Sequence, residues 1–545
     1  METQSIHTEP IWESLISRAS NINKPANHLK RLIGMPDRLK NFSAEIDGFL
    51  YDFSRQRVDS ETMALLVQLA DRRDVIATFN RMMSGERINK TENRAALHTA
   101  CRSFSNDPIR VAGGHNVIPD IKAVQKKIKT FAHRVHAGEL TGHTGKGFRH
   151  MVVIGIGGSY LGTEFVSEAL MAYADKGMQI HYLSNVDIHN FGRITKVIDP
   201  ETTLWIVISK SYTTAETLAN EKQARAFMAD QGLDATRHMI SITAKGSPGD
   251  ITNEDNTARA DILESFHMYD FIGGRYSVSS AVGGVPLSLL IGYDRFEAFL
   301  KGAEEMDRHA AGSEPTKNIP LIAALVSIWN NNFLNYRAQA IIPYAAPLCK
   351  LAPHIQQLNM ESNGKSVTAH GAPVSVPTGG VIFGEPGTNA QHSFFQLAHQ
   401  GMPIPIEFIG VIQPQYTAFE NRSRGVTNHQ ELWANLLSQP MALATGKDAP
   451  DPAKCFSGNR PSSMILLPDL SPRSVGRLLS FYESKTVFEA FLWGINPFDQ
   501  FGVELGKQLA TDIRREMAEK NQNSGHTWDQ VDAITRYYLD ALFKM

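Results

Sequence analysis

Residues 151–217 contain two apolar segments, each followed directly by a turn and then by a helical pattern. Residues 151–156 lead into Gly157-Gly158-Ser159, and residues 203–208 lead into a run of hydroxyl side chains and one lysine at 209–217. Short apolar runs bounded by turn residues are typical of strands that are buried on both faces. Two such units in one parallel sheet place both turns at the carboxyl ends of their strands. The stretch therefore predicts a doubly wound α/β arrangement.

The two predicted turns carry groups that suit a phosphate dianion. They offer glycine N–H groups, several hydroxyls, Lys210 and the N-termini of the following helices. Thr213 and Glu216 have the spacing of a capping box, which predicts that a helix begins there. A glycine turn between a strand and a helix is also common as a plain connection, so both interpretations stay open on these residues alone.

Two familiar nucleotide-binding loops fit the same stretch poorly. A dinucleotide-binding turn requires a third glycine where Tyr160 follows Gly155 and Gly157. A P-loop would follow its strand, but Gly145-Lys146 precedes it, and Gly147 replaces the Ser or Thr that would hold magnesium. The pattern therefore counts against a nicotinamide oxidoreductase and against an ATP-binding loop.

Composition narrows the class of protein. A chain of 545 residues predicts two large lobes, and a net charge of −2 gives no general attraction to nucleic acid or to an anionic membrane. The three cysteines are scattered without metal-ligand spacing, as expected of free thiols in a reducing compartment. The first residues lack a signal sequence, and no apolar run approaches the roughly 20 residues of a membrane span. We expect a cytoplasmic protein.

The rest of the chain separates into a helical flank and α/β segments. Up to about residue 110 the spacing favours helices, with Ile46, Phe49, Leu50 and Phe53 expected on one helical face, and residues 119–136 predict another helix. Alternating strands and helices then favour α/β organisation. The predicted strands are 151–156, 180–183, 203–208 and 238–243, followed in a second lobe by 340–342, 406–412 and 464–467.

Six stretches, taken together and in this order, resemble the phosphoglucose isomerase family over about residues 30–510. They are residues 154–159, 209–217, 273–277, 360–365, 384–389 with Gln391 and His392, and 498–507. One short motif alone would be weak evidence, but six in one order are very specific. The resemblance implies reversible isomerisation of glucose 6-phosphate and fructose 6-phosphate in glycolysis and gluconeogenesis, without metal or cofactor.

The resemblance also implies an architecture. It predicts two doubly wound sugar-isomerase α/β sandwich lobes, with a helical N-terminal flank and a C-terminal tail, and a homodimer whose active site lies between the lobes. The expected divisions are a flank at 1–120 that packs on the second lobe, a first lobe at 121–285, a second lobe at 286–515 and a tail at 516–545. The apolar tail tip near Tyr537, Tyr538 and Phe543 is expected to dock on a neighbouring chain.

By position, the resemblance assigns the functional residues. The phosphate cradle is formed by Ser209, Lys210, Ser211, Thr214 and Thr217, with Gly158 and Ser159 beside it; the sugar-contacting or catalytic positions are Arg275, Gln357, Glu361, His392, Gln500 and Lys507. Three residues depart from the family pattern. Tyr160 stands where aspartate is usual, Ser211 replaces the commoner threonine, and Phe501 replaces tryptophan.

The chemistry of the implied reaction matches these residue types. One proton moves between C2 and C1, and a single carboxylate can remove and return it, which makes Glu361 the candidate base. His392 and Lys507 are candidates for ring opening, and Arg275 would stabilise the enediolate. In the family the histidine reaches the site of the neighbouring chain. Without the resemblance, a solvated glutamate, a core or surface histidine and a plain Glu504–Lys507 helix pair would be the ordinary interpretations.

Other functions remain as alternatives on the sequence. A related sugar-phosphate isomerase or epimerase would use the same architecture. A sugar-phosphate sensor would keep the cradle but is expected to lack the carboxylate, histidine and lysine, and all three are present. The third alternative is the nicotinamide oxidoreductase, against which Tyr160 counts.

Overall fold

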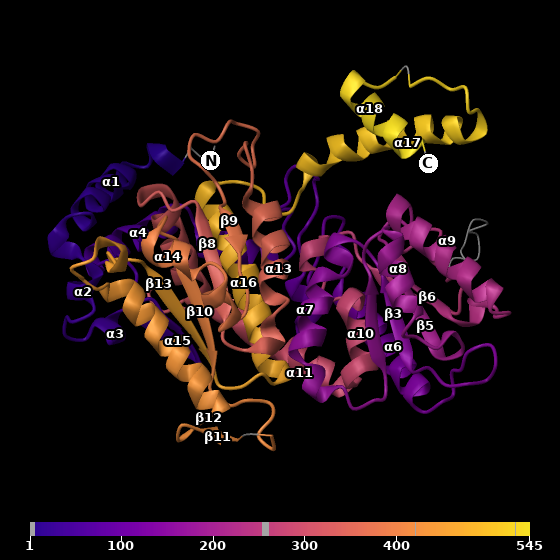
Figure 1. The fold of residues 1–545 in the computed structure, drawn as a ribbon, viewed down its shortest axis with the longest axis horizontal. Helices are drawn as coiled ribbons and strands as arrows, with labels where there is room; N and C mark the ends of the chain where they lie inside the picture. Colours follow the sequence, from indigo (N-terminus) through magenta and orange to yellow (C-terminus); the bar gives the residue numbers. More distant parts are fainter. Residues whose placement is uncertain (1–5, 253–260, 420, 529, 545) are drawn as a thin grey trace. The chain divides into compact units, whose positions relative to one another are not determined.

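The computed structural model describes residues 6–252, 261–419, 421–528 and 530–544, which form two compact units (Figure 1). The larger unit spans Met1–Phe498 and the smaller one Asp499–Met545. The larger unit contains two mixed α/β halves, each built around its own sheet.

The first sheet is five-stranded and entirely parallel, in the order β4-β3-β5-β6-β7. Its strands are β3 (His150–Ile154), β4 (Gln179–Leu183), β5 (Thr203–Ile208), β6 (Met239–Ala244) and β7 (Glu264–Met268). The first four confirm the predicted strands, and β7 was not predicted. The chain reverses its direction of winding between β3 and β5, which is the place where ligands bind in open sheets of this order.

Helices cover both faces of this sheet (Figure 1). Alternate strand residues point to opposite faces, so Val153 packs in one apolar cluster and Val152 in another. The first cluster includes α6 (Ile118–His136), α7 (Leu161–Ala169) and α10 (Ala281–Ile291), and the second includes α8 (Ile188–Thr195) and α9 (Ala215–Asp230). Burial on both faces explains why these strands read as continuous apolar runs.

The second sheet is six-stranded, in the order β1-β2-β13-β10-β8-β9. Its parallel part consists of β8 (Ala338–Pro343), β9 (Val381–Phe383), β10 (Ile406–Val411) and β13 (Ser462–Leu467). Read as β9-β8-β10-β13, this part repeats the winding of the first sheet, with its reversal between β8 and β10. A short antiparallel pair, β11 (Arg422–Ser423) and β12 (Val426–Thr427), lies apart from both sheets.

The prediction of a helical face at Ile46, Phe49, Leu50 and Phe53 is wrong. Residues Ser43–Ile46 (β1) and Phe49–Asp52 (β2) form a hairpin, and β2 pairs antiparallel with β13 at the edge of the second sheet. Asp47 and Gly48 make the turn, and both have positive φ, at 47° and 81°. A two-residue Asp-Gly connection with positive φ at both positions favours a hairpin, and this local signal overrides the apparent helical spacing.

Helices pack on both sides of the second sheet. On the side shared with the first half lie α11 (Tyr293–Gly312), α12 (Ile319–Ile328) and α16 (Pro472–Trp493), while α14 (Phe395–Gln400) and α15 (Asn428–Thr445) contribute to the cluster on the other side. The N-terminal helices are α1 (Pro10–Ile22), α2 (Leu29–Leu32), α3 (Arg38–Asn41), α4 (Ser60–Arg72) and α5 (Val75–Met83), of which α5 contacts α11 and α16.

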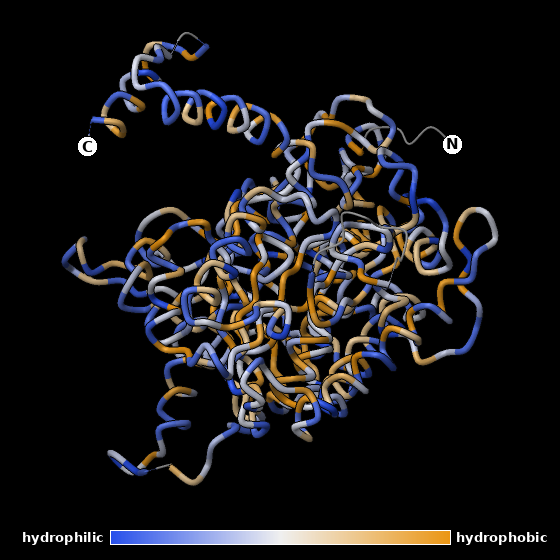
Figure 2. Tube along the Cα trace, turned by 90° about the vertical axis from the view of Figure 1, so that its right-hand side faces the viewer, coloured by the Kyte–Doolittle hydropathy of each residue, from blue (hydrophilic) through white to orange (hydrophobic). Residues whose placement is uncertain are grey.

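Every residue of α16 except Arg473 is buried, although the helix carries several charged side chains. Figure 2 shows how the hydrophobic residues gather along the inner strands and helices of the larger unit, while the outer loops are mostly hydrophilic. Charges in such surroundings require partners, because an unpaired buried charge is very costly. The partners of these α16 side chains matter for both stability and the site described below.

The smaller unit consists of α17 (Glu504–Gln522), a connecting loop and α18 (Ala533–Leu542). Trp528 in the loop is buried, and its indole Nε1 donates to Asp540 Oδ1 of α18 at 2.7 Å. Ile534, Tyr537 and Tyr538 remain 72%, 70% and 66% exposed on α18. The helix pair thus has a packed inner side and a large apolar surface left in solvent.

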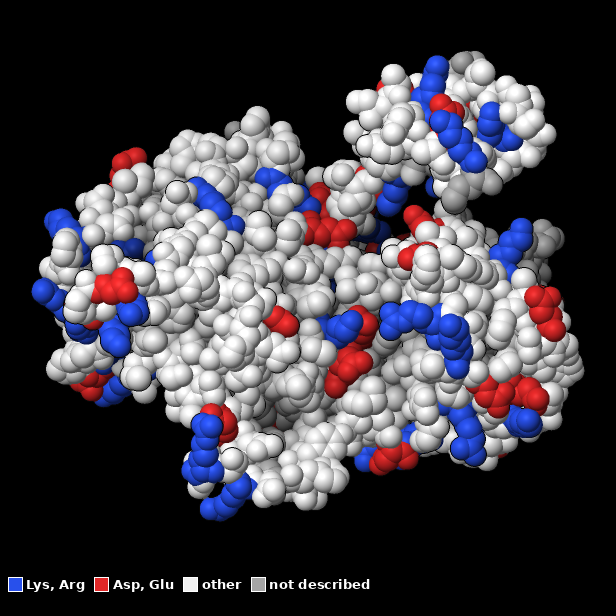
Figure 3. Space-filling model, in the orientation of Figure 1, with Lys and Arg blue, Asp and Glu red and all other residues white. Residues whose placement is uncertain are grey.

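No helix among the described residues is long and apolar enough to cross a membrane. Basic and acidic side chains alternate over the face drawn in Figure 3, in keeping with a net charge close to zero.

Arg102 forms the most deeply buried ion-pair network that links the N-terminal region to α11 and α16. Its guanidinium donates to both carboxylate oxygens of Asp307, at 2.6 and 2.7 Å, and to Glu483 at 2.5 Å. Ser279 and Ser480 also accept from it, at 3.1 and 3.4 Å. Burial raises the pKa of Glu483 to about 7 in spite of the guanidinium. Without Arg102, two carboxylates would face each other in the core.

We expect Arg102→Met to destabilise the fold by about 3–5 kcal/mol, since removing one partner leaves buried charges uncompensated. Thermal and urea unfolding would measure the loss. Arg295→Met is the matched control: Arg295 makes a two-pronged ion pair with Asp175 at 2.7 and 2.8 Å, but this pair lies at the surface and should be worth at most about 1 kcal/mol. An equal decrease in the free energy of unfolding in Arg102→Met and Arg295→Met would contradict a structural role for the buried network.

Candidate active site

The turns that follow β3 and β5 meet at the winding reversal of the first sheet and border a cavity of about 430 Å³. This arrangement confirms the expected meeting of the two turns at the carboxyl ends of their strands. The cavity is lined by Ile156, Ser159, Ile208, Ser209, Lys210, Ser211, Thr214, Thr217, Ala244 and Asp270. Six of the residues expected in a phosphate cradle therefore share one cavity.

Hydroxyl groups in this cavity bond to one another along the second turn. Ser209 Oγ donates to Thr214 Oγ1 at 3.3 Å, and Ser211 Oγ lies 2.6 Å from Thr213 Oγ1. Between them, Tyr212 has a positive φ of 54°, which turns the chain sharply enough to bring both hydroxyl pairs to the strand end. An anion could replace these mutual bonds with stronger charge-assisted ones.

The predicted capping box at Thr213 and Glu216 does not form. Helix α9 begins at Ala215, and its N-cap, Thr214, accepts no hydrogen bond from the helix through its side chain. The first N–H groups of a helix have no intrahelical acceptors, and the positive end of the helix dipole lies there. An uncapped N-terminus beside a hydroxyl-lined cavity favours binding of an anion.

Lys210 contributes the positive charge of the cavity. Its ammonium donates to the carbonyls of Asp270 and Ile272 at 3.0 and 3.3 Å and lies 3.6 Å from the Asp270 carboxylate. Burial lowers the pKa of Lys210. Sequence analysis did not select Asp270, because this residue follows the carboxyl end of β7, a strand that was not predicted. Its carboxylate is 83% exposed, so solvent screens its repulsion of an anion.

Gly158 brings the first turn into backbone contact with the segment that carries Arg275. A Cβ on Gly158 would lie 2.2 Å from the carbonyl carbon of Gly274, which leaves no space for any side chain. Ser277 Oγ also donates to the Gly158 carbonyl at 3.2 Å. The glycine is therefore required for close approach, and it fixes Arg275 beside the cavity edge.

Arg275 is almost completely buried and joins three parts of the chain. Its Nε donates to Ser362 Oγ at 2.7 Å, its Nη2 donates to the Pro497 carbonyl at 2.5 Å, and its Nη1 lies 3.4 Å from Glu361 Oε2. The Glu361 side chain is 22% exposed, so solvent or a ligand can reach the carboxylate. The structure thus places a fixed cation against one side of an accessible acid.

Glu361 ends a π-helical segment, Gln356–Glu361, that continues α13 (Leu351–Ile355). Single π-helical turns within helices occur frequently at functional sites. Gln357 of this segment approaches Gly157 of the first turn: its Nε2 lies 3.1 Å from the position that a Gly157 Cβ would occupy. Gln357 Oε1 is buried and accepts no hydrogen bond from the described residues. A sugar hydroxyl would satisfy this acceptor.

His392 lies in another part of the second half. It ends a short 3-10 helix, Asn389–His392. Its side chain is exposed, and among the residues that the structure describes the ring has no hydrogen-bond or ion-pair partner. Gln391 next to it accepts from Tyr344 Oη at 3.0 Å. The contacts of this single chain do not bring His392 to Glu361.

Three of the predicted or noted residues, Gln500, Phe501 and Lys507, belong to the smaller unit. Lys507 Nζ lies 2.9 Å from Glu504 Oε1 on α17, as their spacing of three residues predicts. Both side chains are mainly exposed, at 63% and 51%. The lysine is thus accessible, and its role in the reaction stays a prediction.

One cluster of metal-ligand type was not visible in the sequence. Glu516, Glu519 and His526 place one ligand atom each within 4.8 Å of one another in the smaller unit. His526 hydrogen-bonds to Glu516 at 2.9 Å and lies 3.5 Å from Glu519, so the ring already bridges the two carboxylates. Sequence spacing does not reveal this cluster, because His526 reaches the two glutamates of α17 through a loop.

Comparisons with known proteins agree with this geometry. A sequence model of the family described as "Phosphoglucose isomerase" matches residues 52–533. The chain belongs to the phosphoglucose isomerase family. A glucose-6-phosphate isomerase from Desulfosudis oleivorans is 63% identical over 542 residues, which cover 99% of each chain. A cytosolic glucose-6-phosphate isomerase from Zea mays is 44% identical over 524 residues, which cover 93% of this chain and 91% of that relative.

A solved structure agrees with the family assignment. The crystal structure of a glucose-6-phosphate isomerase from Chlamydia trachomatis superimposes with a TM-score of 0.87 at 36% identity, covering 95% of this chain and 97% of that one. Like its family, the chain catalyses the reversible isomerisation of glucose 6-phosphate and fructose 6-phosphate in glycolysis and gluconeogenesis. The other sugar-phosphate isomerase, the non-catalytic sensor and the oxidoreductase are not favoured.

If the cavity holds the phosphate, Lys210→Ala should raise KM for both sugar phosphates about tenfold or more, because a hydrogen bond to a charged group contributes about 1.5–3 kcal/mol. Steady-state kinetics in both directions would measure the change. Lys222→Ala is the matched control, since Lys222 is an exposed lysine on α9 outside the cavity. A KM that responds equally to both substitutions would place the phosphate elsewhere.

Proposed function

We propose that Glu361 is the base of the isomerisation and that Arg275 stabilises the enediolate. The observation that carries this proposal is the 3.4 Å pair between Arg275 Nη1 and Glu361 Oε2, in which the cation is buried and the acid remains accessible. Glu361 removes the proton from one of the two carbons C1 and C2 and returns it to the other. The guanidinium lies beside the charge that develops on the neighbouring oxygens, where a preorganised cation is most effective.

Phosphate binding orients the sugar for this step. In the proposal, Ser209, Ser211, Thr214 and Thr217 donate to the phosphate, and Lys210 balances its charge. Gly158 and Ser159 form the wall toward Arg275, and Gln357 Oε1 accepts from a sugar hydroxyl. Binding energy gained at the phosphate, which does not react, can hold C1 and C2 at Glu361 and lower the entropic cost of the reaction.

Ring opening needs a second set of groups, which we assign to His392, Lys507 and Gln500. One group accepts a proton from a sugar hydroxyl, and another donates to the ring oxygen. The exposed imidazole of His392 and the exposed ammonium of Lys507 are able to do this. Tyr160, at the start of α7, adds an aromatic side chain where the family pattern has aspartate, and Phe501 and Ser211 leave these assignments unchanged.

The active form in this proposal is a homodimer in which His392 reaches the site of the neighbouring chain. Two observations support it: His392 is exposed and lies apart from the contacts around Glu361, and α18 leaves Ile534, Tyr537 and Tyr538 largely exposed. Large exposed apolar side chains grouped on one short helix favour a protein interface.

The proposal also includes the lobe divisions and the location of the protein. In this proposal the first lobe spans 121–285, the second lobe spans 286–515 and a tail spans 516–545. The flank, residues 1–120, packs on the second lobe, and the pairing of β2 with β13 supports this placement. The cytoplasm is the proposed location, supported by plant relatives that are named cytosolic. The proposed steps use side chains alone and require no metal or cofactor.

Replacing the base tests the central assignment. Glu361→Gln keeps the shape but removes the proton acceptor, and we expect kcat to fall at least about a hundredfold, the lower range for acid–base catalysis. Substrate should still bind. Exchange of the C2 proton with solvent, followed by NMR in heavy water, should fall in parallel. Exchange that survives while isomerisation is lost would identify a different base.

The shared site can be tested by reassembling two inactive variants, Glu361→Gln and His392→Ala. In a mixed dimer one site carries both defects and the other carries neither. Random pairing at equal amounts makes about half of the dimers mixed, so about a quarter of all sites should be intact and activity should rise toward that fraction. Subunit exchange is verified with differently tagged chains. If each histidine serves its own chain, every site in a mixed dimer is defective and activity stays near zero.

A further inference from the structure

Glu489 of α16 binds the segment that carries Glu361 from behind. Its Oε2 accepts from Asn359 Nδ2 at 2.6 Å and from Asn363 Nδ2 at 2.8 Å. All three side chains are buried, with Glu489 1%, Asn359 4% and Asn363 0% exposed. One carboxylate oxygen therefore fixes both ends of a five-residue stretch whose central residue is Glu361.

The spacing of these residues determines which way Glu361 points. In a helical turn, residues four apart lie on the same face, and a residue two positions from each of them points to roughly the opposite side. Asn359 and Asn363 face α16, so Glu361 is directed away from α16 and toward Arg275. Ser362, next to Glu361, accepts from Arg275 Nε at 2.7 Å. The segment is thus held from two sides.

Lys485 fixes the other oxygen of Glu489. Its ammonium lies 3.1 Å from Glu489 Oε1, one helical turn earlier on α16, and its side chain is 4% exposed. Burial opposes its charge, but the carboxylates of Glu489 and Glu407 outweigh that effect and raise the pKa of Lys485. The two oxygens of Glu489 thus have different partners: Oε2 accepts two hydrogen bonds, whereas Oε1 has the ion pair with Lys485 and no hydrogen bond among the described residues.

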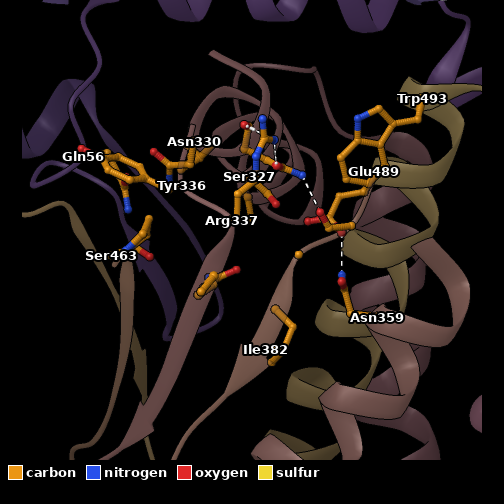
Figure 4. A pocket seen from close by; sticks show the side chains of 18 of the residues that line it. Gln56, Ser327, Asn330, Tyr336, Arg337, Asn359, Ile382, Ser463, Glu489 and Trp493 are labelled. Carbon is orange, nitrogen blue, oxygen red and sulfur yellow. Dashed lines mark hydrogen bonds between the residues drawn. The ribbon is translucent and has the colours of Figure 1, made fainter. Parts of the chain in front are cut away.

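A small cavity adjoins Glu489, and Glu361 is not among the residues that line it. It measures about 40 Å³ and is lined by polar groups that include Asn330, Arg337 and Asn359, together with Trp493 (Figure 4). A cavity of this size holds water molecules, whereas sites for small organic ligands are typically about 300–1,000 Å³. The carboxylate therefore serves the catalytic segment and not a second substrate site.

We propose that Glu489 is a positioning residue for the isomerisation: through Asn359 and Asn363 it holds Glu361 in the orientation required for proton transfer. The inference rests on the proposed role of Glu361 as the base. A buried Lys–Glu pair is weak evidence for stability, because apolar residues of similar volume often stabilise as well or better. A role in orienting Glu361 explains why a charged acceptor occupies position 489, since its charge-assisted hydrogen bonds hold the amides of Asn359 and Asn363 in a fixed geometry.

The test compares two buried glutamates of the same helix. Glu489→Gln keeps the volume but removes the charge. If the single amide oxygen faces the two asparagines, its NH2 group faces the Lys485 ammonium, and if the oxygen faces Lys485, the NH2 group faces two amide donors. We expect kcat to fall about ten- to a hundredfold, the range that a misplacement of about 1 Å can produce, with KM changed less than about twofold. The control is Glu483→Gln, because Glu483 is 0% exposed and binds Arg102. This substitution should lower the melting temperature while kcat stays near that of the parent enzyme.

A second variant keeps the test decisive if Glu489→Gln folds poorly. Asn359→Ala removes one of the two donors and leaves the Lys485–Glu489 pair intact. It should also lower kcat with little change in KM. Hydrogen–deuterium exchange of the peptide covering residues 356–365 should rise in both variants and not in Glu483→Gln. Unchanged kcat in folded Glu489→Gln or Asn359→Ala would overturn the proposal, as would an equal loss of kcat in Glu483→Gln.

Combination with Glu361→Gln separates the two proposals. If Glu489 acts through Glu361, then Glu489→Gln should cause no further loss once Glu361 has been replaced, because the effects of residues that act as a unit are not additive. A further loss as large as that in the parent would overturn the positioning role. Full activity of Glu361→Gln alone would instead contradict the assignment of the base.

Discussion

The side chain of Arg275 connects the parts of the larger unit that make up the site. It donates to Ser362 and to the Pro497 carbonyl and pairs with Glu361, while its own segment touches Gly158 by backbone contact. A guanidinium buried to this extent is tolerated only because its hydrogen-bonding groups find acceptors. The requirement to satisfy the guanidinium holds the segment of Glu361 and Ser362 to the chain after α16, and the backbone contact at Gly158 adds the first turn. The same interaction leaves one guanidinium nitrogen beside the carboxylate.

Sheet topology explains why the cavity between the turns after β3 and β5 lies where it does. The first sheet reverses its winding between β3 and β5, so the chain after β3 and the chain after β5 leave toward opposite faces and a space remains between them. Side chains of the second turn and the N-terminus of α9 border that space. The place of the cavity thus follows from strand order, whereas the hydroxyls and Lys210 that line it, and that we propose bind the phosphate, come from the local sequence.

The sequence was most informative where the causes of structure are local. Apolar runs located seven of the parallel strands, and the turns after β3 and β5 supplied the lining of the cavity. The sequence-based prediction was wrong at β2, where Asp47 and Gly48 have positive φ and form a hairpin although the apolar residues have helical spacing. It was also wrong at the start of α9, where Thr214 and not Thr213 is the N-cap residue. The contribution of Asp270 depended on an edge strand that had no clear apolar pattern. The role of Glu489 could not be predicted, because the two asparagines that it binds lie more than a hundred positions away along the chain.

The two halves share a winding pattern but support different kinds of chemistry. The first half lines its cavity with backbone groups and hydroxyls at strand ends, which suit the proposed phosphate without a large cost in burial. The role proposed for Glu361 requires the second half to hold one carboxylate in a defined direction, and a loop alone would leave that carboxylate mobile. Helix α16 solves this problem by burying Lys485 and Glu489 beneath the π-helical turn, so that the cost of desolvating these charges is offset by bonds that fix the segment. The support beneath Glu361 and the cradle that we propose for the phosphate thus come from different halves of the fold, one from buried charges of a helix and the other from turns at strand ends.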